Sequence, residues 1–201
     1  MLRVPPHRGG WIEVVCGPMF SGKSEEMIRR LRRAEIAGQR IVIFKPRVDD
    51  RYDAADVVSH AGVRMRAVPV ESVAELLSRA DGYDVVGIDE AQFFEPAVVG
   101  AALALADRGV RVVVAGLDQD FRRLPFGPIP DLLALAELVD KLQAVCHRCG
   151  GPATTTQRLV GGRPAPYSGA TVVIGAAEQY ETRCRDCHEP GADAAAVTAA
   201  A

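Results

Sequence analysis

The architecture of this chain follows from the run Trp11-Ile-Glu-Val-Val-Cys16 and the loop directly after it, Gly17-Pro-Met-Phe-Ser-Gly22-Lys23-Ser24. The first run is short, apolar-rich and stops at a glycine, which is typical of a buried parallel strand. The loop matches G-x-x-x-x-G-K-[ST], the pattern of a phosphate-binding loop. After Ser24 the apolar residues follow a helical spacing. Strand, loop and helix therefore come in the order that this motif requires.

Each part of the loop has a predicted role in binding ATP. The glycines let backbone N–H groups approach phosphate oxygens. Lys23 is expected to reach the β- and γ-phosphates, and Ser24 to place its hydroxyl on Mg²⁺. The predicted phosphate-binding residues are Gly17, Pro18, Met19, Phe20, Ser21, Gly22, Lys23 and Ser24. A chance glycine-rich turn is the alternative, and the flanking strand and helix argue against it.

Apolar strands alternate with helices after this loop. Strands are predicted at 11–16, 41–44, 85–88 and 111–115, and helices from Ser24, from Val73 behind a Ser72–Glu75 capping box, and over 96–108 and 131–142. The alternation predicts an α/β fold, a P-loop (RecA-like) parallel sheet flanked by helices. Arg29, Arg30, Arg32 and Arg33 on the first helix are interpreted as a solvated face.

The sequence pattern changes after Leu142. The segment that follows contains cysteine pairs, Gly-Gly turns and short β-prone runs at 154–160 and 171–174. We expect a small zinc-binding β module here. The predicted parts are a loose leader at 1–10, an ATP-binding α/β domain at 11–142, the zinc-binding module at 143–190 and a disordered tail at 191–201.

Composition limits the class of protein. The chain has 201 residues, 48% of them hydrophobic, and a formal net charge of −2, which argues against a general nucleic-acid binder. No apolar run approaches a membrane span, and the N-terminus lacks the apolar stretch of a signal peptide. We therefore expect a soluble, cytosolic protein.

Asp89 and Glu90 directly follow the predicted strand at 85–88. Ligand-contacting residues of a parallel sheet belong at this end of a strand. An acid here fits a Walker-B role toward Mg²⁺, and Glu90 could accept a proton from an attacking hydroxyl. Ordinary exposed loop acids are the alternative, which the nearby phosphate loop disfavours.

Four of the five cysteines form two C-x-x-C pairs, Cys146/Cys149 and Cys184/Cys187. Two such pairs supply the four thiolates that tetrahedral Zn²⁺ takes, and a closed four-sulfur shell predicts a structural metal. His147 and His188 are expected not to bind it. Cys16 is interpreted as a small apolar core residue.

Taken together, the motifs resemble the zinc-containing, P-loop type of thymidine kinase. The resemblance runs from about Trp11 to His188. It is carried by GPMFSGKS at 17–24, IDEAQFF at 88–94, GLDQDF at 116–121, PFGP at 125–128, CHRC at 146–149 and VVIGAAEQYETRCRDC at 172–187.

The resemblance implies transfer of the ATP γ-phosphate to the 5′-hydroxyl of thymidine, with Glu90 as general base. It adds Asp89, Glu90 and Gln92 to the ATP site. It implies a lasso, a loop between the cysteine pairs that closes over thymine. The implied nucleoside-binding residues are Met19, Asp49, Arg51, Phe93, Leu117, Phe121, Thr156, Val172, Val173, Ile174, Gly175 and Tyr180. A homotetramer inhibited by thymidine triphosphate (dTTP) is also implied.

One position departs from the family pattern, because Ala176 stands where the lasso usually has a second glycine after Ile174. Two other readings stay open. The chain could be an ATP-driven nucleic-acid protein with a zinc ribbon, although it lacks aromatics interleaved with basic residues. It could also be a kinase for another deoxynucleoside, among which deoxyuridine is the expected secondary substrate and deoxycytidine a poor one.

Overall fold

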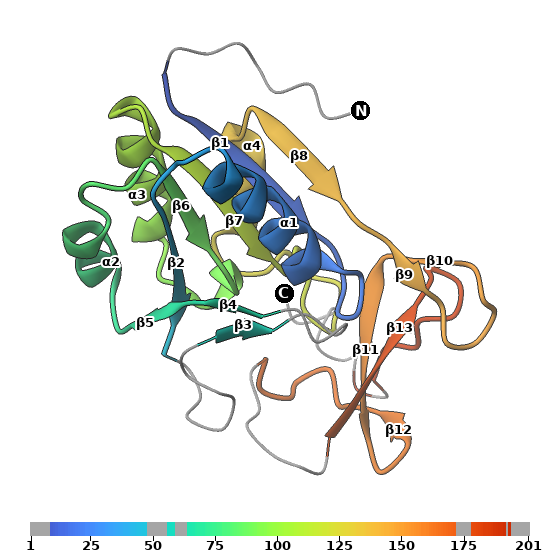
Figure 1. The fold of residues 1–201 in the computed structure, drawn as a ribbon. Coiled ribbons are helices and arrows are strands. Elements are labelled where there is room, and N and C mark those ends of the chain that lie inside the picture. The colour runs from blue at the N-terminus through green and yellow to red at the C-terminus, as the bar shows by residue number, and fades with distance from the viewer. Residues whose placement is uncertain (1–8, 48–55, 59–63, 172–177, 192, 194–201) are drawn as a thin grey trace.

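The computed structural model describes residues 9–47, 56–58, 64–171, 178–191 and 193 (Figure 1). Its centre is a six-stranded sheet with the order β5-β2-β6-β7-β1-β8. All neighbouring strands in it run parallel. They are β1 (Trp11–Cys16), β2 (Ile41–Pro46), β5 (Val68–Val70), β6 (Val85–Ile88), β7 (Arg111–Gly116) and β8 (Leu138–Lys141). The predicted α/β class is confirmed.

Helices cover both faces of this sheet (Figure 1). On one face, α1 (Lys23–Ile36) packs Met27 and Leu31 against the strands. On the other face the core is completed by α2 (Val73–Arg79), α3 (Ala97–Asp107) and α4 (Ile129–Leu135). Burial on both faces explains why the central strands read as apolar runs rather than as alternating patterns.

The predicted helices from Ser24, Val73 and Pro96 are confirmed with small boundary shifts. The Ser72 hydroxyl accepts a hydrogen bond from the Glu75 N–H at 3.2 Å, so the predicted cap of α2 is present. A short 3-10 helix, η1 (Ala91–Phe93), follows β6.

The prediction of a helix over 131–142 is wrong for the second half of that range. The helix α4 ends at Leu135, and residues 138–141 form β8, the edge strand beside β1. Leucine and alanine favour a helix locally, but pairing with β1 supplies backbone hydrogen bonds that outweigh this preference. The Glu137 N–H, for example, donates to Ile12 O at 3.0 Å.

The interpretation of Arg30 as part of a solvated helix face is also wrong. Arg30 is 2% exposed. Its guanidinium donates to Glu13 of β1 and to Glu26 at 2.8 Å each, and it also binds Asp140 of β8. Arg111 of β7 binds the same Glu13 carboxylate at 2.6 Å. Buried arginines of this kind are retained only when carboxylates satisfy them.

The remaining strands form smaller sheets. One pairs β9 (Ala144–Val145) with β10 (Pro152–Ala153), and another has the order β12-β11-β13. The members of the latter are β11 (Thr155–Val160), β12 (Arg163–Pro164) and β13 (Glu178–Arg183). A hairpin of β3 (Asp56–Val58) and β4 (Arg64–Arg66) adjoins α1. The strand predicted at 154–160 corresponds to β11. Residues 172–174 of the other predicted run lie outside the described residues, as do 1–8 and most of the predicted tail.

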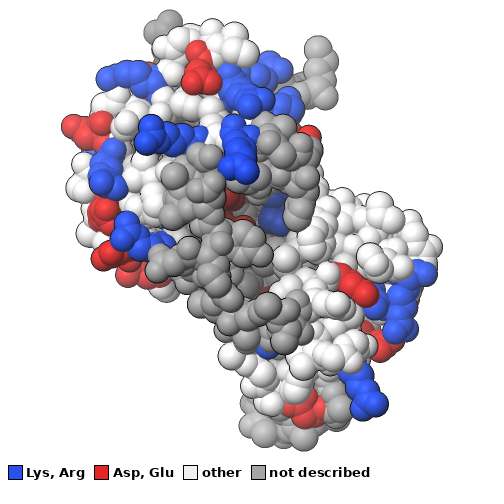
Figure 2. Space-filling view, turned by 60° about the horizontal axis from the view of Figure 1, so that its bottom comes forward, with Lys and Arg blue, Asp and Glu red and all other residues white. Residues whose placement is uncertain are grey.

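Charges are mixed over the surface that Figure 2 shows, where basic and acidic side chains are interspersed rather than gathered into one basic patch. Among the helices of the described residues, none combines the length and apolar character needed to cross a bilayer.

Candidate active site and metal centre

The phosphate loop leaves the end of β1 and enters α1 directly. Gly17 and Gly22 have φ values of 142° and 86°, and a Cβ at Gly17 would lie 2.5 Å from Leu142 O. Glycine is therefore required at position 17. No side chain caps the start of α1. The amides of its first turn thus form the positive end of a helix dipole, where anions bind.

Lys23 folds back over this loop. Its Nζ donates to Pro18 O at 2.7 Å, and the Ser21 hydroxyl donates to the same carbonyl at 2.8 Å. Burial lowers the pKa of Lys23, while the negative charges of Glu90, Asp89 and Asp118 oppose that shift. The ammonium group of Lys23 therefore lies within electrostatic reach of three carboxylates that follow β6 and β7.

Asp89 and Glu90 follow β6 but differ in environment. Asp89 is 7% exposed, and burial, with the added charge of Glu90, raises the pKa of Asp89 to about 7. Glu90 is exposed and has a left-handed backbone, with φ 50°. Its carboxylate accepts a hydrogen bond from Gln92 Nε2 at 2.5 Å.

Gln92 links the Glu90 carboxylate to the residues that follow β7. It is 3% exposed, and its Oε1 accepts the Leu117 N–H at 2.9 Å. A Cβ at Gly116 would lie 2.7 Å from that Oε1, and one at Gly127 would lie 2.3 Å from Gln92 O. These two glycines leave the space that Gln92 occupies.

The residues expected to line a nucleoside pocket are tied to the same edge of the sheet. The Met19 N–H donates to Thr156 Oγ1 at 3.0 Å, which joins the phosphate loop to β11. The ring of Phe93 meets Phe126 edge-on at 5.6 Å. Phe121 is 7% exposed, and the Arg158 guanidinium lies 5.0 Å from its ring centroid. Tyr180 lies opposite Arg158 in the pairing of β13 with β11.

Several of the predicted residues are not placed by the structure. Asp49, Arg51, Val172, Val173, Ile174, Gly175 and the departing Ala176 lie outside the described residues. The stem leading into 172–175 is described: Arg158 donates to Ala170 O at 2.5 Å, and Arg122 donates to the Thr171 hydroxyl at 3.3 Å.

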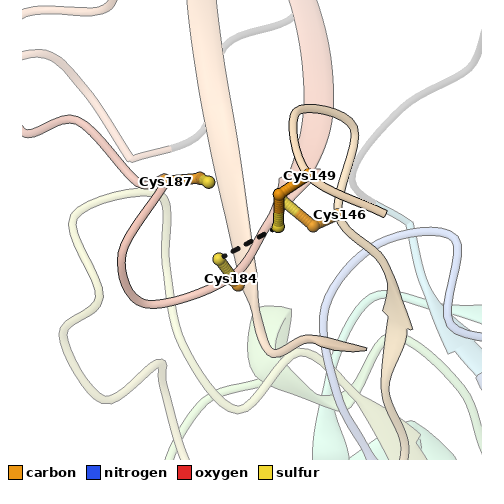
Figure 3. Close-up of side chains that lie close together, drawn as sticks. All are labelled: Cys146, Cys149, Cys184 and Cys187. Atoms are coloured by element: carbon orange, nitrogen blue, oxygen red, sulfur yellow. Dashed lines mark hydrogen bonds between the residues drawn. The ribbon is translucent and has the colours of Figure 1, made fainter. Parts of the chain in front are cut away.

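The four paired cysteines converge in space (Figure 3). Their sulfur atoms all lie within 4.8 Å of one another, and Cys149 Sγ is 3.7 Å from Cys184 Sγ. Zinc–sulfur bonds of about 2.3 Å in a tetrahedron place sulfurs about 3.8 Å apart. The donor set and its spacing therefore fit a zinc ion.

Neither neighbouring histidine belongs to this sulfur cluster. His188 Nε2 donates to Phe121 O at 2.9 Å, and burial lowers the pKa of His188. The His147 backbone N–H donates to Thr182 O at 2.8 Å. His188 thus ties the second cysteine knuckle to the loop that carries Phe121.

The model of the family described as thymidine kinase matches residues 10–188. The chain belongs to the thymidine kinase family. Membership makes the protein a kinase, and the phosphate loop, the acids after β6 and the cysteine cluster all lie within the matched residues.

Among solved structures, this thymidine kinase family member is similar to the genome packaging NTPase B204 from Sulfolobus turreted icosahedral virus 2, in complex with ATP-gammaS. The TM-score is 0.45 at 18% sequence identity, covering 66% of this chain and 74% of that chain.

Two residues at this edge were not predicted from the sequence. Asp118 follows β7 and forms an ion pair of 2.7 Å with Lys141 at the end of β8. Asp118 carried a usable signal, an acid just after a predicted strand. Lys141 carried none, because its segment was predicted to be helical.

Proposed function

We propose that the protein transfers the γ-phosphate of ATP to the 5′-hydroxyl of thymidine, giving thymidine monophosphate and ADP. Deoxyuridine is the proposed secondary acceptor. The observation that carries the proposal is the carboxylate of Glu90, which Gln92 holds beside the phosphate loop in a chain of the thymidine kinase family.

The phosphate end of the proposed site is built from β1, α1 and β6. Lys23 and the first-turn amides of α1 bind the phosphates, and Ser24 and Asp89 would hold Mg²⁺. A hydroxyl and a buried carboxylate are oxygen ligands of the type that this ion prefers. When bound, Mg²⁺ neutralises negative charge on the phosphates.

Glu90 is the proposed general base. Its exposed carboxylate is free to meet an incoming hydroxyl, and Gln92 limits its rotation. A carboxylate is a weak base, and phosphoryl transfer has a loose transition state in most analyses. Most of the acceleration should therefore come from positioning and from charge on Lys23 and Mg²⁺, with Glu90 adding on the order of 10²–10⁴.

The nucleoside end is assigned to Met19, Phe93, Leu117, Phe121, Thr156 and Tyr180, together with Asp49, Arg51 and the lasso residues 172–175. Residues 11–142 would bind ATP, and residues 143–190, stabilised by a structural zinc, would grip thymine. A cytosolic homotetramer inhibited by dTTP completes the proposal. These assignments are supported by family membership and by the contacts that Met19, Phe121 and Thr156 make.

Thymidine-dependent release of ADP from Mg·ATP is the direct test. We expect thymidine to stimulate release strongly, deoxyuridine less, and deoxycytidine or single-stranded DNA hardly at all. Lys23→Met is the matched control, because it removes the phosphate-binding charge without changing the nucleoside pocket much. Stimulation by DNA but not by thymidine would instead support an ATP-driven nucleic-acid protein.

A further inference from the structure

Asp118 is a buried acid with only half of its carboxylate satisfied. The residue is 6% exposed, and its Oδ2 accepts the ion pair from Lys141 at 2.7 Å. Its Oδ1 is buried without a hydrogen-bond partner among the described residues. Leaving a buried carboxylate oxygen unsatisfied is costly, so such an oxygen in a native protein calls for an explanation, for example a functional role.

Asp120, two residues later in the same loop, provides a comparison. It is 4% exposed, and both of its oxygens are occupied. Oδ1 accepts the N–H groups of Arg122 and Leu124 at 2.8 and 3.1 Å, and Oδ2 accepts the Arg122 guanidinium at 2.6 Å. Asp120 therefore has a complete structural explanation, whereas Asp118 does not.

The position of Asp118 points to the nucleotide. The strand β7 lies between β6, which is followed by Asp89, and β1, which is followed by the phosphate loop. Carboxyl ends of parallel strands meet at one edge of a sheet, where ligands bind. Lys141 lies opposite Cys16 in the pairing of β8 with β1, so the Asp118–Lys141 ion pair passes across the point where the phosphate loop begins.

The ionisation of Cys16, the last residue of β1, agrees with this placement. Burial raises the pKa of the Cys16 thiol to about 11, and the charge of Asp118 adds to that shift. The Asp118 carboxylate therefore lies within electrostatic reach of Cys16, the residue directly before the phosphate loop.

We propose that Asp118 is a further positioning residue of the Mg·ATP site, whose free Oδ1 accepts a hydrogen bond from a water molecule of the magnesium hydration shell. Mg²⁺ gives up its waters reluctantly and usually keeps several of them in protein sites. A carboxylate at this position orients such a water, and Lys141 balances the charge of the carboxylate. This inference rests on the proposed use of Mg·ATP but not on the identity of the nucleoside.

Binding of Mn²⁺, a paramagnetic stand-in for Mg²⁺, tests this proposal without turnover. The full chain is held in excess over the non-hydrolysable analogue AMP-PNP, and free Mn²⁺ is followed by electron paramagnetic resonance. Outer contacts to a metal's ligands typically change its affinity by about 10- to 100-fold. We expect Asp118→Asn to raise the Kd of Mn²⁺ about tenfold or more, while AMP-PNP binding without metal is not weakened.

Asp120→Asn is the matched control and should leave the Mn²⁺ affinity near that of the unmodified protein. Lys141→Met removes the ion pair but keeps the carboxylate, so Mn²⁺ affinity should stay the same or increase. This second variant keeps the test decisive even where Asp118→Asn melts early. A purely structural ion pair predicts equal effects of Asp118→Asn and Lys141→Met.

Three results would overturn the proposal. They are equal effects of Asp118→Asn and Lys141→Met on Mn²⁺ affinity, an unchanged Mn²⁺ affinity in folded Asp118→Asn, and a lower Mn²⁺ affinity in Lys141→Met. Thymidine-dependent ADP release by the unmodified protein is measured separately, because it tests the proposed acceptor and not the role of Asp118. A protein without that activity but with the expected Mn²⁺ effect would refute the proposed acceptor and retain the role of Asp118.

Discussion

Glu90 is held in a backbone conformation that residues other than glycine rarely adopt. Its φ and ψ of 50° and 41° lie in the left-handed region. A non-glycine residue there costs on the order of 1 kcal/mol or more, and such residues cluster at functional sites. The turn begins η1, so it places the Glu90 carboxylate and the Gln92 amide side by side. We infer that the local strain serves to aim this carboxylate.

The variant Glu90→Gln tests the proposed role of Glu90 as general base, because it replaces one carboxylate oxygen by an amide nitrogen. The amide keeps the size of the side chain but cannot accept a proton, so turnover should fall on the order of 10²–10⁴ while ATP affinity changes little. Steady-state kinetics with thymidine and ATP give both quantities. Glu95→Gln is the control, because Glu95 Oε1 accepts the Val73 N–H at the start of α2, an interaction that a glutamine oxygen can also make. Unchanged turnover in Glu90→Gln would remove Glu90 from the chemistry.

Single residues were predictable from sequence where a short motif implies a chemical role. The convergence of the cysteine pairs is of this kind, since two C-x-x-C pairs indicate one metal site. The roles of the loop glycines, Lys23 and Glu90 stay predictions from their motifs. Arg30 was not predictable. Its burial depends on Glu13 and Asp140, which lie 17 and 110 positions away in the sequence.

At the level of elements, the carboxylate of Glu13 joins the sheet to the helix behind the phosphate loop. Burial by itself raises the pKa of Glu13, but hydrogen bonds and charge from Arg111, with help from Trp11 and Arg30, outweigh it and hold the pKa below the ordinary value of 4.5. A lowered pKa means that Glu13 stabilises the folded protein above about pH 4.5, and that this contribution is lost as the pH falls.

Glu13→Gln should therefore lower the free energy of unfolding at pH 7 by about 3 kcal/mol, because Arg30 and Arg111 lose a buried counter-charge. The difference from the unmodified protein should shrink as the pH is lowered from 5 to 3.5. Urea unfolding at each pH measures it. Arg79→Met, which removes the exposed pair with Glu75, should change stability by less than about 1 kcal/mol. A Glu13→Gln deficit that is constant with pH would contradict the ionic explanation.

Strands and helices were predictable where burial on both faces or a cap gave a clear local signal, as in β6 and α2. The error over 131–142 arose because local preference and tertiary pairing disagree there. The residues of β8 are mostly exposed, so they lack the apolar run that identified the other strands. The partner with which they pair in parallel, β1, lies more than 120 positions earlier in the sequence.

For the whole molecule, the cysteine cluster links two turns of the β-rich part, residues 144–191. It joins the turn between β9 and β10 to the turn after β13, and His188 extends this connection to Phe121. Zinc removal should therefore affect thymidine binding more than ATP binding.

Cys149→Ser provides the test. We expect it to lose the bound zinc, to melt at a lower temperature and to lose stabilisation by thymidine, while AMP-PNP still raises the melting temperature. Metal analysis and thermal shift measure these effects. Cys16→Ala is the matched control, because the fifth cysteine lies in the core and should leave the zinc content unchanged. Full zinc content in Cys149→Ser would rule out the four-sulfur site.

The hydrogen bond from the Met19 N–H to Thr156 Oγ1 has a consequence for the whole catalytic cycle. One end belongs to the loop expected to hold the phosphates, and the other to a strand of the β-rich part. If ATP binding to the loop shifts Met19, this hydrogen bond changes, and the stability of the position of β11 changes with it. In a closed thermodynamic cycle such an effect is reciprocal, so each substrate alters the affinity of the other by the same factor. For the proposed kinase, this predicts that the donor and the acceptor of the phosphate are energetically coupled before any bond between them begins to form.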